Sequence, residues 1–138
     1  MFVKIDKMDT PFKVKIKIES IDIDNLNHVN NAVYVKWMDN VAREHWAFLT
    51  KDNPLEEFIW VVSRHEIDYK NEAFLGDEIT AKTWVGNTRG VTSERFIEFY
   101  KGTVLLAKSR TVWVLLNATT FKPARIRENI LNLLLPAK

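Results

Sequence analysis

Hydrophobic and polar residues alternate near the beginning of the chain and recur at a wider spacing further along. From Phe12 to Ile18 every second residue is apolar, and each residue between them is a lysine. This period of two is typical of a strand with one buried face. From Tyr34 to Leu49 the apolar residues recur every three or four positions, which predicts one amphipathic helix of about five turns.

The chain from about residue 59 to residue 116 has the pattern of successive strands. We expect four of them, over residues 59–69, 77–85, 91–101 and 103–116. Glycine stands in each junction between them, as is common in hairpin turns. The last strand is apolar on both faces from Val112 to Leu116, more than one helix could cover, and a partner subunit could cover the rest. Pro123 and the apolar residues after it predict a short closing helix with proline near its first turn.

These elements follow the order strand, long helix, four strands and short helix. Such an order predicts an α+β domain in which an antiparallel sheet wraps around a single helix. The 138 residues suit one domain over residues 1–138, with a core that needs no covalent staples. The net charge of +2 is too small to predict a nucleic-acid or membrane-surface partner.

Several kinds of chemistry are excluded by what the sequence lacks. It contains no cysteine, which removes disulfides, thiolate metal sites and a cysteine nucleophile. No apolar run is long enough for a signal peptide or a membrane span, so we expect a cytoplasmic protein. His28, His45 and His65 show none of the short spacings of zinc ligands, and no metal is predicted. We interpret His45 and His65 as hydrogen-bonded core histidines.

Residues 22–34 are the densest cluster of polar groups in the chain. They contain two carboxylates, a histidine and four amides, immediately before the predicted helix. A helix N-terminus offers unpaired N–H groups and partial positive charge, so it can hold a developing oxyanion while a nearby acid or base acts. Asn30 or Asn31 suits the N-cap of this helix.

A family resemblance appears in the same cluster. The pattern Asp-x-Asp at 22–24, His-Val-Asn-Asn at 28–31, and Tyr34 and Trp37 entering the helix resembles the hot-dog thioesterases. The resemblance is to the branch of 4-hydroxybenzoyl-CoA thioesterase and the acyl-CoA and acyl-ACP thioesterases. Residues 69–78 resemble a second family segment, in which an aromatic strand residue leads to a Gly-Asp turn. The resemblance covers nearly the whole chain.

The resemblance implies a hot-dog fold and an acyl-CoA thioesterase without a cofactor, with Asp24 as its catalytic carboxylate. Asp24 would either deprotonate a water molecule or attack the thioester to form an anhydride, and both routes remain open. The oxyanion would lie at the backbone of residues 30–32, with Asn30 and Asn31 as caps that fix this site. His28 either assists Asp24 or satisfies a loop carbonyl. In this family the carboxylate and the helix end can come from different subunits, so we expect a homodimer or homotetramer.

Three further residues are substrate-binding candidates. Arg89 lies in a turn that resembles the family segment near the CoA phosphates, although a turn arginine is often merely solvated; Lys122 and Arg125 are poorer candidates. Tyr34 is expected near the substrate because it belongs to the family pattern. Glu72 falls where plant acyl-ACP thioesterases carry a catalytic glutamate, but Leu26 replaces the asparagine of the plant pattern. This departure favours a solvated loop residue for Glu72 and turns the match toward the acyl-CoA branch.

Other interpretations remain open at this point. The protein could hydrolyse acyl-ACP, act as a hot-dog hydratase or dehydratase, or bind acyl thioesters without turnover. His28 lies in the turn and outside the hydratase motif, which argues against the hydratase. Four aromatic residues could line an acyl pocket but are interpreted as ordinary core, namely Trp37, Trp46, Phe48 and Trp60. The acyl group itself cannot be inferred.

Overall fold

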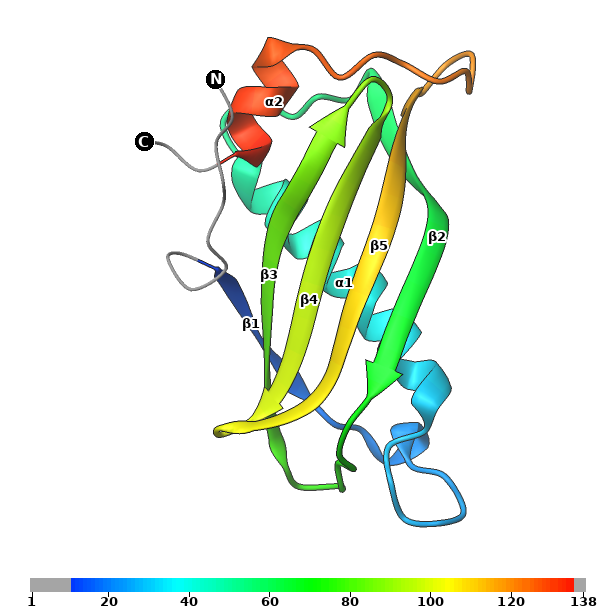
Figure 1. Ribbon diagram of the computed structural model, residues 1–138, viewed down its shortest axis with the longest axis vertical. Helices are drawn as coiled ribbons and strands as arrows, with labels where there is room; N and C mark the ends of the chain where they lie inside the picture. Colours follow the sequence, from blue (N-terminus) through cyan, green and yellow to red (C-terminus); the bar gives the residue numbers. More distant parts are fainter. Residues whose placement is uncertain (1–10, 136–138) are drawn as a thin grey trace.

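The computed structural model describes residues 11–135 of the chain. Its elements are β1 (Phe12–Lys17), the 3-10 turn η1 (Ser20–Asp22), α1 (Asn31–Leu49), β2 (Phe58–Tyr69), β3 (Glu78–Arg89), β4 (Thr92–Lys101), β5 (Val104–Asn117) and α2 (Glu128–Leu134). The described residues form a five-stranded sheet in the order β1-β3-β4-β5-β2, and all its neighbouring strands are antiparallel. Figure 1 shows α1 lying along one face of this sheet and α2 at one end. The predicted hot-dog fold is confirmed.

The core lies between α1 and the inner face of the sheet. Met38 and Val41 of α1 pack in one cluster with Ile79, Ile97 and Phe99 of the two central strands, and each is at most 1% exposed. Burying each such side chain stabilises the fold by about 1.5–3 kcal/mol. Alternation along each strand therefore decides which residues meet α1 and which face outward.

Of the two glycines in the junction predicted before residue 91, Gly90 has the expected turn role and Gly86 does not. β3 continues to Arg89, so the expected end at residue 85 is wrong. Gly86 lies inside the strand, where a Cβ would meet Glu94 Oε1 at 2.6 Å and the Phe96 ring at 2.7 Å. It is required by this close approach, whereas the turn itself is made at Gly90, which has a φ of +63°.

The closing helix begins later than expected. α2 starts at Glu128, so the prediction of proline in its first turn is wrong. Pro123 instead forms an isolated bridge with Leu116, and the Ala124 N–H donates to Leu115 O at 2.8 Å. These contacts hold the chain extended beside β5, and the helix can begin only after them.

One polar cluster is enclosed between α1 and the sheet. Arg95, on the inner face of β4, is 5% exposed. Its Nη1 donates to His45 Nδ1 at 2.8 Å and to Thr83 Oγ1 at 3.0 Å. Because a cation donates to it, Nδ1 carries no proton and the His45 ring is neutral. Burial, and then the charge of Arg95, lower the pKa of His45 to about 3.

This low pKa predicts an acid-sensitive stability. Between pH 6.5 and 3 the unfolded chain binds a proton at His45 that the folded chain does not bind. The free energy of unfolding therefore falls as the pH decreases. The slope contributed by one such group is at most about 1.4 kcal/mol per pH unit. We expect His45→Gln, which keeps a hydrogen-bond acceptor, to flatten the pH dependence of urea unfolding measured from pH 7 to pH 4. Equal slopes for the two proteins would contradict this account.

Candidate active site

The polar turn before α1 is a compact loop built around Asp24. An isolated antiparallel bridge between Ile23 and Val29 closes it. Asp24 Oδ1 accepts the N–H of Leu26 at 2.9 Å and that of His28 at 3.2 Å, and the Asp24 N–H donates to His28 O at 2.8 Å. Within residues 11–135, Oδ2 receives no hydrogen bond. One carboxylate oxygen is therefore fixed by the backbone and the other is available for chemistry.

The loop is held in shape by its backbone. Asn27 has a φ of +66°, a left-handed conformation that asparagine tolerates better than most residues. Asp22 is 5% exposed and its Oδ2 accepts the Glu19 N–H at 2.9 Å, so its role here is structural. The Asn30 N–H donates to Asp22 O at 2.8 Å. The two ends of the loop are thus tied together.

α1 begins with one amide donor still available. Asn30 is the N-cap, as predicted: its side-chain oxygen accepts the Ala32 N–H at 3.1 Å. The Val33 N–H donates to Asn30 O. For the Asn31 N–H the described part of the chain supplies no acceptor. Of the three amides considered for an oxyanion site, residues 30–32, only that of Asn31 can therefore donate to a ligand.

A second segment brings Glu72 to the loop. The Val29 N–H donates to Ala73 O at 2.8 Å, which places residues 72–74 beside the turn. His28 Nε2 lies 3.4 Å from Glu72 Oε2, and the His28 ring meets the Phe74 ring edge-on at 5.6 Å. The Glu72 side chain is 62% exposed, so it is solvated as predicted but also paired with His28. Residues distant in sequence thus form one cluster with Asp24.

Tyr34 lies behind this cluster rather than at its surface. It is 2% exposed, and its hydroxyl has no partner among the residues described. Its ring packs edge-on against those of Trp37, Tyr69 and Phe99. Burial, and then Tyr69, raise the pKa of Tyr34 to about 12, so the phenol keeps its proton at neutral pH. A role in substrate binding stays a prediction.

Tyr69 belongs to the site although no role was predicted for it. Its hydroxyl donates to Asn31 O at 2.9 Å, which fixes the first residue of α1 from the end of β2. The sequence carries only a weak signal for this contact, an aromatic residue that ends a strand. The contact pairs residues that no local pattern could connect.

Arg89 lies far from Asp24 within one chain. β1 leads into the turn, and its last residue Lys17 pairs with Glu78 at the beginning of β3, whereas Arg89 ends that strand. Eleven strand residues span roughly 36 Å. Figure 1 shows the carboxyl end of β3 and the beginning of α1 at opposite ends of the molecule. Arg125 precedes Ile126, whose N–H donates to Gly90 O, so it lies at the Arg89 end.

The aromatic candidates divide into three groups. Trp37 is core, as expected. The rings of Trp46 and Trp60 meet edge-on with their centroids 5.6 Å apart, and both line a cavity at the far end of α1. Phe48 is 51% exposed. His65 bonds to Thr111 Oγ1 at 2.8 Å inside the sheet.

Residues 11–135 contain no group of three histidine, aspartate or glutamate side chains arranged to hold a metal ion. Over the same range no helix is both long and apolar enough to cross a membrane.

A long helix wrapped by an antiparallel sheet, with a carboxylate in the turn that enters the helix, defines a hot-dog protein of the thioesterase type. Residues 19–134 match the model of the Thioesterase-like superfamily, and the chain belongs to this family. No curated protein matches the chain.

Solved structures of similar fold agree with this assignment. A predicted thioesterase from Bacillus stearothermophilus is 26% identical with a TM-score of 0.82, covering 91% of this chain and 94% of its own. A hypothetical Staphylococcus aureus protein in complex with CoA is 17% identical with a TM-score of 0.81, and the match covers 90% of this chain and 81% of that protein. A 1,4-dihydroxy-2-naphthoyl-CoA thioesterase from Synechocystis is 17% identical with a TM-score of 0.73, and the match covers 91% of this chain and 96% of that enzyme.

The N-cap provides a test of how the helix end is held. Asn30→Ala removes the acceptor of the Ala32 N–H and should lower the free energy of unfolding by about 1 kcal/mol, whereas Asn30→Asp keeps that acceptor. Asn25→Ala, at an exposed position of the same turn, should change stability by less than about 0.5 kcal/mol. Urea denaturation measures all three. An Asn30→Ala protein as stable as the parent would show that the cap does not hold α1.

Proposed function

We propose that the protein hydrolyses the thioester of an acyl-CoA to the free acid and CoA, with Asp24 as its catalytic residue. The observation that carries this proposal is the geometry of the turn. Asp24 Oδ1 is fixed by two backbone N–H groups and Oδ2 is free within the described residues, next to the start of α1. The family supplies independent support, because its members include thioesterases.

The hydrolysis needs a base or nucleophile and a site for negative charge. In the first route Oδ2 takes a proton from water while the water oxygen attacks the carbonyl carbon. In the second, Oδ2 attacks directly and an anhydride forms, which water then opens. In either route the carbonyl oxygen becomes negative and accepts the Asn31 N–H, assisted by the partial positive charge of the helix end. The C–S bond then breaks, and the CoA thiolate takes a proton, from Asp24 in the first route and from solvent in the second.

His28 and Glu72 act as positioning residues in this proposal. The His28 backbone fixes Asp24 from both sides, through its N–H and its carbonyl. Its side chain pairs with Glu72 at the exposed side of the turn, where a substrate would enter. The Tyr69 hydroxyl donates to Asn31 O and its ring packs against that of Tyr34, so both side chains hold the beginning of α1 in place. The oxyanion site is thereby held rigid before substrate binds.

The CoA portion requires a cation, and Arg89 is the proposed one. The similar Staphylococcus aureus structure contains CoA, which supports a CoA carrier for this chain. Since Arg89 and Asp24 lie at opposite ends of one chain, both can serve one site only if it is shared between two subunits.

The edge strand β2 offers a way to form such a dimer. β2 pairs with β5 on one side, and among residues 11–135 no strand pairs with its other side. Val61, Val62 and Tyr69 on this strand are 37–41% exposed. A two-fold axis that pairs the free edges of two β2 strands antiparallel would set the Phe58 end of one against the Tyr69 end of the other. The Arg89 end of one subunit would then approach the Asp24 turn of its partner.

Removal of the catalytic carboxylate tests the chemistry. Asp24→Asn keeps an acceptor for the two N–H groups but supplies neither base nor nucleophile, so kcat on a panel of acyl-CoA thioesters should fall by about 10²-fold or more. Asp52→Asn, in the exposed turn after α1, is the matched control and should retain the parent rate. Release of the thiol is followed with a thiol reagent.

Each alternative gives a distinct result in this assay. Hydration of an enoyl-CoA without thiol release would indicate a hydratase, and saturable binding without turnover would indicate a binding module. Faster turnover of acyl-ACP than of acyl-CoA would identify the carrier as ACP. An unchanged rate in Asp24→Asn would remove Asp24 from the mechanism.

Complementation tests the shared site. Arg89→Gln should raise KM for acyl-CoA by about 10-fold, because one charge-assisted phosphate contact is lost. Mixing Asp24→Asn with Arg89→Gln after subunit exchange would give heterodimers that each contain one intact site. At subsaturating substrate, activity should recover to about a quarter of the parent value, since half of the dimers are mixed.

The same experiment has a clear negative outcome. If both residues serve a site within one chain, mixing the variants gives only the average of their separate activities. Light scattering of the parent should give at least twice the 16.2 kDa of one chain, and a monomer at assay concentration would overturn the shared site.

A further inference from the structure

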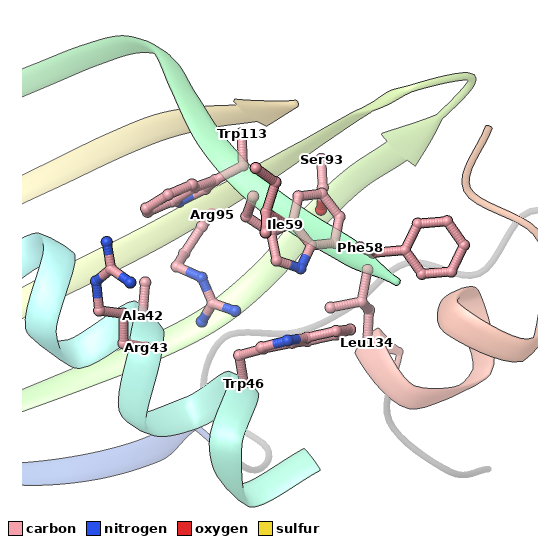
Figure 2. A pocket seen from close by; sticks show the side chains of 10 residues that line it. Ala42, Arg43, Trp46, Phe58, Ile59, Ser93, Arg95, Trp113 and Leu134 are labelled. Atoms are coloured by element: carbon pink, nitrogen blue, oxygen red, sulfur yellow. The ribbon is translucent and has the colours of Figure 1, made fainter. Parts of the chain in front are cut away.

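A cavity of about 210 Å³ lies between the second half of α1, the inner face of the sheet and α2. Its lining is mostly aromatic and apolar, contributed by Ala42, Trp46, Phe58, Trp60, Trp113 and Leu134. Figure 2 shows the guanidinium of Arg95 extending from the sheet into the space above Trp46. An apolar cavity of about 150 Å³ accommodates a benzene ring, so this one has room for a single substituted ring or a short alkyl chain.

Arg95 brings a buried charge to this cavity. It is 5% exposed, and no carboxylate among the described residues lies within ion-pair distance of it. Within residues 11–135 it makes two hydrogen bonds, both from Nη1, to the uncharged acceptors His45 and Thr83. A guanidinium has five N–H donors, so in the described part of the chain Nε and Nη2 have no acceptor. Buried charges in proteins are normally paired, which makes this arrangement unusual for a purely structural arginine.

Two further side chains with N–H donors line the cavity, Trp113 and Arg43. Trp113 is 7% exposed, and its Nε1–H has no acceptor within residues 11–135. Arg43, at the edge of the cavity, already pairs with Asp39 at 2.8 Å, so it does not need a ligand and Asp39 is not available to Arg95. Burial lowers the pKa of Arg95 only to about 10, so it stays charged at neutral pH. The cavity therefore combines mostly apolar walls with the charged Arg95 side chain and with Trp113, whose Nε1–H has no acceptor among the described residues.

We propose that this cavity binds the carboxylate of a small acid with an apolar body, with Arg95 holding the carboxylate and Trp46 and Trp60 enclosing the body. The free face of a guanidinium matches the two oxygens of a carboxylate. The carboxylate belongs either to a free acid or to the far end of an acyl group.

Position distinguishes this cavity from the thioester site of the same chain. Trp46 follows Asn31 by about four turns of α1, roughly 22 Å along its axis. A cavity large enough for one ring cannot contain an acyl chain of that length. Within one subunit the ligand is therefore a separate acid, and an acyl carboxylate could enter only from a thioester bound at the partner subunit.

Tryptophan fluorescence of the parent protein tests the proposal directly. Benzoate and hexanoate should give saturable changes at pH 7, whereas benzamide and hexanol should bind at least about 10-fold more weakly because they lack the charge. Arg95→Lys should weaken benzoate binding by about 10-fold or more, since lysine cannot make the two-point contact. Arg64→Gln, which removes an exposed arginine paired with Glu66, should leave binding unchanged.

A measurement on the parent protein avoids dependence on the folding of Arg95→Lys. In a proton–nitrogen spectrum the indole signal of Trp113, assigned by its loss in Trp113→Phe, should shift as benzoate saturates. Equal affinity for benzoate and benzamide, an unchanged affinity in a folded Arg95→Lys protein, or no saturable signal would each overturn the proposal.

Competition in the Asp24→Asn protein identifies the source of the carboxylate. Displacement of benzoate by glutaryl-CoA but not by butyryl-CoA would show that the carboxylate belongs to an acyl group. Displacement by neither would show that it belongs to a separate acid, and both results support a carboxylate site at Arg95. Because no turnover is needed, loss of the proposed hydrolysis and loss of this binding are distinguishable.

Discussion

Apolar contact between α1 and the inner face of the sheet is the interaction on which the position of the Asp24 turn depends. Met38 and Val41 are held against Ile79, Ile97 and Phe99, with almost no exposed surface. A helix held in this way cannot slide or rotate without opening the core, because buried side chains interlock at close packing. The start of α1 is consequently a rigid platform, and the turn before it takes up a defined place relative to the sheet.

The layer between helix and sheet is not uniform along α1. Its first half is buried and aromatic around Tyr34, which gives the Asp24 turn a firm base. Its second half contains the charged group Arg95 and a cavity. Burying such a charge opposes folding unless other interactions offset it, and the apolar packing of the first half supplies that surplus.

Local patterns predicted the elements, whereas contacts between distant segments determined the details. The helix, its cap at Asn30 and the left-handed Asn27 follow from spacing and from the preferences of asparagine. Gly86 was misread as a turn residue because its neighbours Glu94 and Phe96 lie on another strand. The pairing of His28 with Glu72 likewise depends on the fold, because the segment after β2 comes to lie beside the turn before α1. Arg95 had a readable signal, because a period of two places it on the same face as Ile97 and Phe99.

The hydrogen bond between Val29 and Ala73 also bears on how the protein reaches its native state. It joins the Asp24 turn to a segment that follows the whole of α1 and β2, so it closes a long loop of chain. Closing such a loop is entropically costly, and contacts of high sequence separation form slowly. The native shape of the turn therefore depends on where the segment after β2 lies as well as on the residues of the turn itself. A change that displaces Ala73 would reach the Asp24 turn through this hydrogen bond, although the two segments are far apart in the sequence.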